Sequence, residues 1–288
     1  MRYYYFILFY FFASVLITNA QEKALAKVHY SFYHINDSNH KDQPLRDKVV
    51  TYLSKNSSYY TTYSDVIIQK DIAAQKALAD FTGHIVLKFT TTAIKEFYLI
   101  NKESKEMDKV EAISSSFDAF TYKVPLEEQN WEILEETKEI GGYTCQKAIT
   151  LFKGRTYEAW FTTELPFPFG PWKLHSLPGL ILEAYDDKRE VKFEYNGFEK
   201  LDDDSRVEIP FYVIKSNPSE IEKIRKAFNE DQGTYFQSLQ NSGRMNIGNE
   251  FLGIDYSLHR FDLSNEDDYK PSFKTNNPIE LTERKNLQ

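Results

Sequence analysis

Apolar and polar residues alternate with a period of two in much of the chain. Residues 28–32, 157–161 and 191–195 each carry an apolar side chain at every second position. Because successive side chains of a strand point to opposite faces, such stretches are typical of strands with one buried and one solvated face. A chain that repeats this pattern has to form sheets, and the pattern constrains the fold more than any other feature.

Turn residues separate the strand-like stretches. Lys153-Gly154-Arg155 can form the tight turn of a hairpin between 143–152 and 157–161. A second turn is predicted between 180–185 and 191–195, at Asp186-Asp187-Lys188. The other strand-like stretches are 28–32, 48–55, 85–89, 94–100 and 207–213.

Two segments have helical character. Over 218–230 apolar residues recur at helical spacing, Asn217 can cap the first turn, and Pro218 suits its first position. Residues 64–80 show a less regular apolar face. We therefore predict a mainly β (α+β) fold, a curled antiparallel sheet or half-barrel covered by one or two helices.

Composition narrows the function classes. The chain has 288 residues, a mean hydropathy of -0.54 and a net charge of -8, with 35 basic against 43 acidic side chains. A nucleic-acid binder more often carries a basic excess, so no nucleic-acid partner is predicted. The low hydropathy excludes a polytopic membrane protein.

The N-terminus predicts export. Arg2 precedes an uncharged apolar run over 3–17, and Thr18 and Ala20 are small residues that fit cleavage before Gln21. This run of about 15 residues is shorter than the roughly 20 needed to span a bilayer. We expect residues 1–20 to be a signal peptide, and the mature chain to be periplasmic or extracellular and not membrane-spanning.

One domain and a tail are predicted for the remainder. No Pro/Gly-rich linker or internal repeat divides residues 21–264, which we interpret as a single β-rich domain. Residues 265–288 are polar and contain two prolines, so they are expected to form an extended C-terminal tail. The single cysteine, Cys145, cannot form an internal disulfide.

A short motif resembles a known family. The chain is similar to the GLPGLI family of exported bacterial proteins in two stretches. These are Ala159-Trp160-Phe161-Thr162-Thr163-Glu164-Leu165-Pro166 and, after it, Ser176-Leu177-Pro178-Gly179-Leu180-Ile181. The chain has Ser176 where the hexapeptide of that family begins with glycine. The resemblance implies export but no established activity. The predicted architecture is also similar to that of periplasmic lipoprotein carriers.

The segment 166–178 contains four prolines and several large apolar residues. Proline fixes the backbone angle φ and removes a hydrogen-bond donor, so this segment is neither helix nor central strand. It could be a rigid loop that covers the core, or the lip of a hydrophobic pocket. Under the second interpretation the ligand-binding candidates are Trp160, Phe167, Phe169, Trp172, His175, Leu177 and Pro178.

No catalytic residue, metal site or cofactor is predicted. The six histidines form no HxxxH or HxH pair, and the sequence contains no P-loop, dinucleotide fingerprint or G-x-S-x-G motif. Cys145 lies inside a predicted strand and is interpreted as a structural thiol. Acidic clusters such as Asp202-Asp203-Asp204 are interpreted as solvated turns.

The leading hypothesis is a non-catalytic binding module in the cell envelope. Its ligand would be apolar or peptide-like, such as a lipid, a lipoprotein or a peptide. One alternative is a hydrolase with a site near residues 176–181, using His175 or a carboxylate of Asp186-Asp187. Another is an interaction protein that pairs with an envelope protein through a sheet edge.

Overall fold

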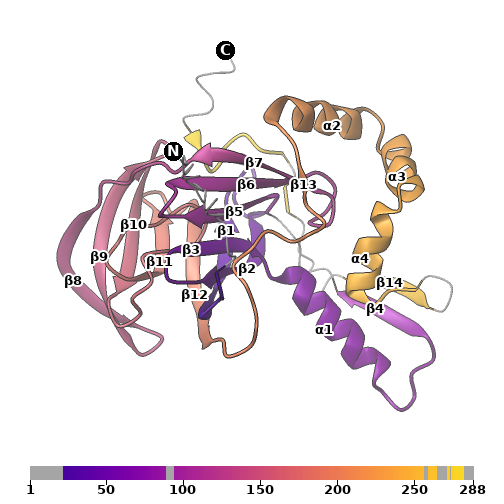
Figure 1. Cartoon of the computed structure of the whole chain (residues 1–288), viewed down its shortest axis with the longest axis horizontal. Coiled ribbons are helices and arrows are strands. Elements are labelled where there is room, and N and C mark those ends of the chain that lie inside the picture. The colour runs from indigo at the N-terminus through magenta and orange to yellow at the C-terminus, as the bar shows by residue number, and fades with distance from the viewer. Residues whose placement is uncertain (1–21, 89–93, 256–258, 265–270, 273, 282–288) are drawn as a thin grey trace, which may run out of the picture.

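A twelve-stranded sheet dominates the molecule (Figure 1). The computed structural model describes residues 22–88, 94–255, 259–264, 271–272 and 274–281. These residues form mainly β structure, with the large sheet, a small two-stranded sheet and four helices. The predicted mainly β class is thus confirmed. The predicted signal peptide lies outside the described residues.

The large sheet is antiparallel except at one edge. Its strand order is β13-β7-β6-β5-β3-β2-β1-β12-β11-β10-β9-β8, and β13 alone pairs in parallel, with β7. The bounds of these strands are β1 (Ala26–His34), β2 (Leu45–Leu53), β3 (Ser57–Thr62), β5 (Glu96–Asn101), β6 (Glu106–Ala112), β7 (Ala119–Pro125), β8 (Glu132–Ile140), β9 (Tyr143–Phe152), β10 (Arg155–Thr162), β11 (Leu180–Asp186), β12 (Val191–Lys200) and β13 (Ile214–Lys215).

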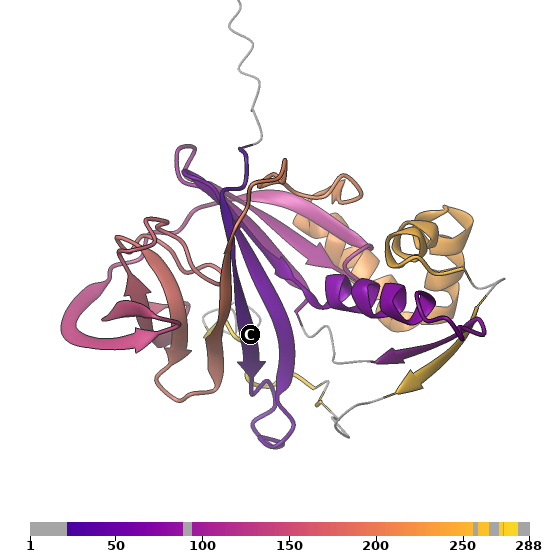
Figure 2. The ribbon, with the colours of Figure 1, turned by 90° about the horizontal axis from the view of Figure 1, so that it is seen from below.

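One long-range pairing joins the two halves of this sheet. β1 pairs with β12 over almost its whole length, from Ala26 opposite Lys200 to His34 opposite Val191. On one side of this pair lie β2 to β7, and on the other lie β11 to β8. Seen from below, the sheet curls so that its two halves enclose a concave face (Figure 2).

The helices gather at one end of the molecule, beside the small sheet (Figures 1 and 2). Helix α2 covers the predicted range, and the side chain of Asn217 accepts a hydrogen bond from the amide of Glu220 at 3.1 Å. The sequence predicted one or two helices, and the described residues hold four. The remaining bounds are α1 (Ser64–Lys76), α2 (Pro218–Glu230), α3 (Gln232–Asn241), α4 (Arg244–Leu252), β4 (His84–Lys88) and β14 (Arg260–Ser264).

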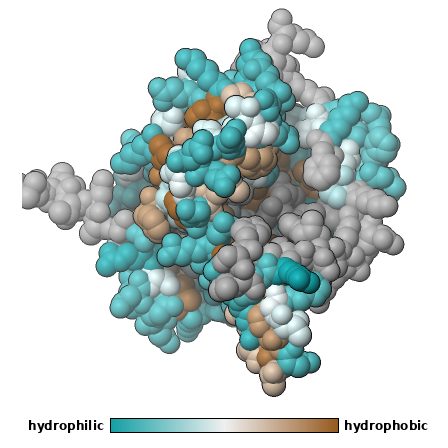
Figure 3. All heavy atoms as spheres, turned by 90° about the vertical axis from the view of Figure 1, so that its right-hand side faces the viewer, coloured by the Kyte–Doolittle hydropathy of each residue, from teal (hydrophilic) through white to brown (hydrophobic). Residues whose placement is uncertain are grey.

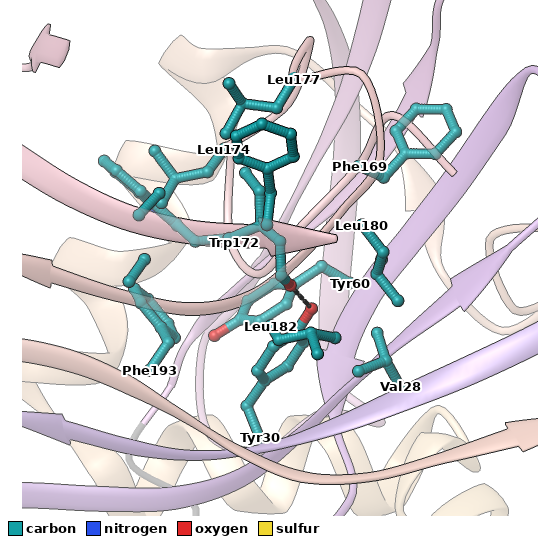
Figure 4. Close-up of a cluster of buried hydrophobic side chains, with 14 of the residues drawn as sticks. Val28, Tyr30, Tyr60, Phe169, Trp172, Leu174, Leu177, Leu180, Leu182 and Phe193 are labelled. Atoms are coloured by element: carbon teal, nitrogen blue, oxygen red, sulfur yellow. Dashed lines mark hydrogen bonds between the residues drawn. The ribbon is translucent and has the colours of Figure 1, made fainter. Parts of the chain in front are cut away.

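The proline-rich segment between β10 and β11 covers the concave face. Phe169, Trp172, Leu174 and Leu177 are buried there and belong to the main hydrophobic cluster. Figure 4 shows these side chains gathered over those from the strands, such as Tyr30. The segment is therefore the core-covering loop that one of the two interpretations predicted.

Close backbone packing holds the end of this loop. A Cβ atom on Gly179 would lie 2.0 Å from the carbonyl oxygen of Thr162, which is far inside van der Waals contact. The next residues are clamped as well, since the Tyr30 hydroxyl donates to the carbonyl of Ile181 at 2.6 Å. The loop thus depends on a glycine for space and not for an unusual φ angle.

The C-terminal segment lies against the same half of the sheet. The guanidinium of Arg155 is buried and donates to Asp186 at 2.5 Å, to the side chain of Asn277 at 2.8 Å and to the carbonyl of Pro278 at 2.8 Å. The guanidinium of Arg155 is therefore fully engaged by these described residues. The predicted boundary between a domain over 21–264 and a tail over 265–288 stays a prediction.

We expect Gly179→Ala to destabilise the protein by more than about 2 kcal/mol, because the backbone of Thr162 cannot move without disturbing β10. Urea unfolding followed by circular dichroism measures this. The matched control is Gly233→Ala in α3, where the atom nearest to the new Cβ is Oδ1 of Asp231 at 3.3 Å, at the end of a side chain, and where helix propensity favours alanine by up to about 1 kcal/mol. Equal stability of the two variants would contradict the packing described for this loop.

Candidate functional site

A cavity of about 210 Å³ lies between the sheet and the helical end of the molecule. We call it the aromatic pocket, because six aromatic side chains line it. They come from β2, β3, β5, the turn after β6, the segment before β13, and α4. These residues are Tyr52, Tyr59, Phe97, Phe117, Tyr212 and Phe251.

Strand alternation places the floor of the aromatic pocket. Tyr59 and Thr61 of β3 line it, whereas Tyr60 between them belongs to the cluster on the concave face. Tyr59 and Phe97 pack in a second hydrophobic cluster with Val110 and Val207. The rings at the floor are therefore held by core packing, which gives the pocket a preformed shape.

A few polar groups accompany these rings. Asp65, in the first turn of α1, accepts a hydrogen bond from the Ser116 hydroxyl, and burial raises the pKa of this carboxyl. Burial, and to a lesser degree the nearby Asp65, raise the pKa of Tyr212 to about 12, so its hydroxyl is neutral at physiological pH. Arg206 and Glu208 also line the pocket, and neither forms an ion pair with any described residue.

Such a set of groups suits a ligand with both apolar faces and hydroxyls. The rings provide flat surfaces for stacking, and the carboxylates, guanidinium and hydroxyls can exchange hydrogen bonds. The surrounding surface differs in character. On the face shown in Figure 3, apolar residues stand in separate groups among hydrophilic ones.

A buried carboxylate lies close to the start of helix α1. Asp47 of β2 is 4% exposed and accepts hydrogen bonds from the Ser64 hydroxyl at 2.7 Å and from the amide of Ile94 at 3.1 Å. The Thr62 hydroxyl donates to it at 3.1 Å. Asp47 thereby connects β2 with the start of α1 and the residue before β5. Burial raises its pKa to about 7.

A second cavity, of about 140 Å³, opens on the concave face. We call it the inner pocket. Rings and aliphatic side chains form most of its wall, and Trp172 contributes from the covering loop. Its lining residues are Phe32, His34, Leu45, Tyr60, Ile94, Lys95, Glu96, Tyr98, Trp172 and Ile279.

His175 lines a third, open depression of about 300 Å³ with Lys102, Lys105 and Ser176. Its Nε2 atom donates to the carbonyl of Glu127 at 3.1 Å, so Nδ1 accepts from the Ser176 hydroxyl at 2.6 Å. Burial lowers the pKa of His175 to about 4. The ring is therefore neutral at pH 7 but a weak base.

The structure does not bring the seven predicted ligand-binding residues to one site. Phe169 and Leu177 are core residues, Phe167 is half-buried, and Pro178 is exposed. Trp160 lies on another part of the sheet, with the Lys138 ammonium 4.4 Å from its ring centre. Trp172 and His175 line two different cavities. Whether any of them binds a ligand stays a prediction.

The groups proposed for a hydrolase are also apart. Asp186 is engaged by Arg155, while His175 bonds to Ser176 and Glu127. Cys145 is buried, and burial raises the pKa of its thiol to about 11, which keeps it protonated. Among the described residues, no three His, Cys, Asp or Glu side chains are placed to hold a metal ion.

The outer strand β8 forms one edge of the large sheet. Its pairing with β9 is irregular between Ile133 and Thr137, and exposed glutamates such as Glu135 and Glu139 stand along it. Irregular pairing and charge are features that oppose edge-to-edge association. Pairing with an envelope protein through this edge stays a hypothesis that the strand itself does not favour.

Comparison with known families assigns the chain to one of them. The family model described as "N-glycanase peptide, N-terminal domain" matches residues 50–206, more than half of the chain. The chain belongs to this family. The match contains most of the aromatic pocket, from Tyr52 to Arg206. None of the curated proteins compared with the chain matches it.

Two solved structures that partly resemble this chain are described as PNGF-II, in a P21 and a C2 space group. They are 17% and 16% identical to this chain, with TM-scores of 0.45 and 0.44. In each case the similarity covers 69% of this chain and 32% of the other. The chain thus matches about a third of the length of these proteins.

The predicted resemblance to the GLPGLI family is wrong, because the matching family model is that of the N-glycanase N-terminal domain. The hexapeptide has a physical explanation in this fold. Gly179 provides space against Thr162, and Leu180 and Ile181 are fully buried as β11 begins. Such a motif reflects the packing of a loop that enters a strand.

No helix in the described part of the chain is long and apolar enough to cross a membrane.

We expect the stability of Asp47→Asn to depend on pH differently from that of the unmodified protein. The pKa of Asp47 rises from 3.8 to about 7 on folding, so the folded state retains a proton that the unfolded state loses between these values. The free energy of unfolding that Asp47 contributes is therefore greatest below about pH 4 and is lost as the pH rises through 7.

The difference in the free energy of unfolding between Asp47→Asn and the unmodified protein should therefore shift in favour of the variant by on the order of 4 kcal/mol between pH 4 and pH 8. Altered hydrogen bonding should add a loss of stability that is the same at every pH. Urea unfolding at a series of pH values measures the difference. Asp42→Asn, at an exposed position, should follow the unmodified protein. A constant offset for Asp47→Asn at every pH would refute the assignment.

Proposed function

We propose that this chain is a glycan-recognition module that binds the carbohydrate of an N-glycosylated protein in the aromatic pocket. The observation that carries the proposal is a preformed cavity lined by six aromatic side chains together with Asp65, Arg206 and Glu208. The family membership supports the same ligand class, because the family is named as a domain of N-glycanases. We further propose that the chain acts after export, as the composition of residues 1–20 predicts.

The chemistry of sugars fits this pocket. A pyranose ring has an apolar C–H face and a rim of hydroxyls, which matches rings such as Tyr212 beside polar groups such as Asp65. A volume of about 210 Å³ equals that of roughly seven liquid water molecules, which suits one monosaccharide unit. The pocket would thus hold one sugar and leave the rest of a glycan in solvent. A lipid would need a longer apolar cavity than this one.

Binding is favoured over hydrolysis by the state of the candidate groups. The Ser176–His175 contact is the arrangement closest to a nucleophile with a base, but the lowered pKa of His175 makes it a weak proton acceptor. Asp186, the other group considered, is neutralised by Arg155. We therefore propose recognition of a glycoprotein, and we assign bond cleavage to none of these residues.

We expect Tyr212→Ala to weaken the binding of an N-glycopeptide about tenfold, since it removes a stacking ring worth roughly 1.4 kcal/mol. Isothermal titration calorimetry with a high-mannose N-glycopeptide, and with the same peptide lacking the glycan, measures this. Tyr212 lies in the turn before β13 and outside the main hydrophobic cluster, so its truncation should leave the fold intact.

Phe211 offers a matched control. It precedes Tyr212, has a ring of similar size, and is 93% exposed without lining the pocket. Phe211→Ala should retain the affinity for the glycopeptide within about twofold. If the glycan-free peptide binds as tightly as the glycopeptide, or if both variants behave alike, the proposed site is wrong.

A further inference from the structure

The inner pocket lies on the opposite face of the sheet from the aromatic pocket. Tyr59 lines the aromatic pocket, and the next residue along β3, Tyr60, lines the inner pocket. Because neighbouring residues of a strand point to opposite faces, the sheet itself separates the two cavities. The inner pocket is therefore not an extension of the proposed glycan site.

The shape and lining of the inner pocket suit a single aromatic ring. Phe32, Tyr98 and Trp172 contribute rings to its wall, and Leu45, Ile94 and Ile279 contribute aliphatic side chains. The rings of Tyr60 and Tyr98 lie stacked, with centroids 6.3 Å apart and planes 24° apart. Its volume of about 140 Å³ is close to the roughly 150 Å³ of an apolar cavity that accepts benzene.

One hydroxyl in this wall lacks a partner. Tyr60 is 3% exposed, and its hydroxyl makes no hydrogen bond with any described residue. Two nearby buried tyrosines differ, since the Tyr30 hydroxyl donates to the carbonyl of Ile181 and the Tyr98 hydroxyl to Glu96. Because this hydroxyl is not sealed from solvent, a ligand in the pocket can reach it and form a hydrogen bond with it.

The charged groups at the inner pocket are already engaged. The Lys109 ammonium neutralises Glu96 at 2.6 Å, and the Lys95 ammonium donates to the carbonyl of Ser114 at 3.1 Å. His34 donates from Nε2 to the carbonyl of Asn277 at 2.8 Å, and burial lowers its pKa to about 4, so it is neutral at pH 7. Because these groups already have partners or are neutral, no charge in the pocket needs a charged ligand to neutralise it.

We propose that the inner pocket is a second binding site, which takes a small neutral aromatic molecule of the phenol class. The ring lies among the side chains of Tyr60, Tyr98 and Trp172, and its hydroxyl forms a hydrogen bond with the Tyr60 hydroxyl. The pocket has room for one ring and its substituent, which favours a free small molecule over a ring attached to a polypeptide backbone.

Two probes and two variants test this proposal. Binding of p-cresol and of toluene, which differ by one hydroxyl, is measured by ¹H–¹⁵N NMR titration of the full chain. We expect p-cresol to bind about tenfold more tightly than toluene. Tyr60→Phe should remove this difference because it deletes only the hydroxyl. The affinity for p-cresol should fall about tenfold, and the affinity for toluene should stay unchanged.

The matched control is Tyr33→Phe, which deletes a hydroxyl from β1 on the face opposite to Phe32 and should leave p-cresol affinity within about twofold. Equal affinity of p-cresol and toluene, or no effect of Tyr60→Phe, would overturn the proposal. So would tighter binding of the peptide Gly-Tyr-Gly than of p-cresol, which would indicate a polypeptide partner. N-glycopeptide binding should be unaffected by Tyr60→Phe, so the two proposed sites can fail independently.

Discussion

Covering the concave face is the constraint on which this structure depends. A curled sheet of twelve strands presents a wide apolar surface that no neighbouring strand can bury, and the helices lie at the other end of the molecule. The loop between β10 and β11 fills that space with large side chains such as Phe169 and Trp172. Its prolines restrict the backbone in the unfolded chain as well, which lowers the entropic cost of ordering it.

Segments far apart in the sequence, β1 and the described residues near Ile279, both contribute to this arrangement. β1 sits at the middle of the sheet, where it joins the two halves by pairing with β12. The described C-terminal residues are held by the buried guanidinium of Arg155, and Ile279 from this segment lines the inner pocket. The cavity on the concave face thus exists only after contacts distant in sequence have formed, which makes it a product of the complete fold.

Local features of the fold could be predicted from the sequence, because they depend on neighbouring residues. Alternation located the strands, and Asn217 with Pro218 located α2. Helices α3 and α4 were missed, since each buries little of its surface and therefore shows no clear apolar face: Leu239 and Gly248 are their buried residues. The seven predicted site residues were chosen because a proline-rich segment with large apolar residues can form the lip of a pocket, but the covering loop uses most of them for packing.

The aromatic pocket could not be predicted in this way. Its rings come from segments between residues 52 and 251, so no spacing along the chain relates them. The signal that existed was the abundance of tyrosine and phenylalanine, which does not distinguish a core residue from a pocket residue. Tyr59 and Tyr60 illustrate the difficulty, because identical neighbouring residues serve cavities on opposite faces.

The register of β3 therefore determines which tyrosine lines which of the two cavities. Tyr59 lies opposite Leu99 and Tyr60 opposite Tyr98 in the pairing of β3 with β5. A slip of one residue would exchange the faces of all side chains in β3, placing Tyr60 in the aromatic pocket and Tyr59 in the core. Burial of Tyr60 and Tyr98 under the covering loop opposes such a slip. The loop that completes the core is thus also what fixes the tyrosines of the two cavities in place.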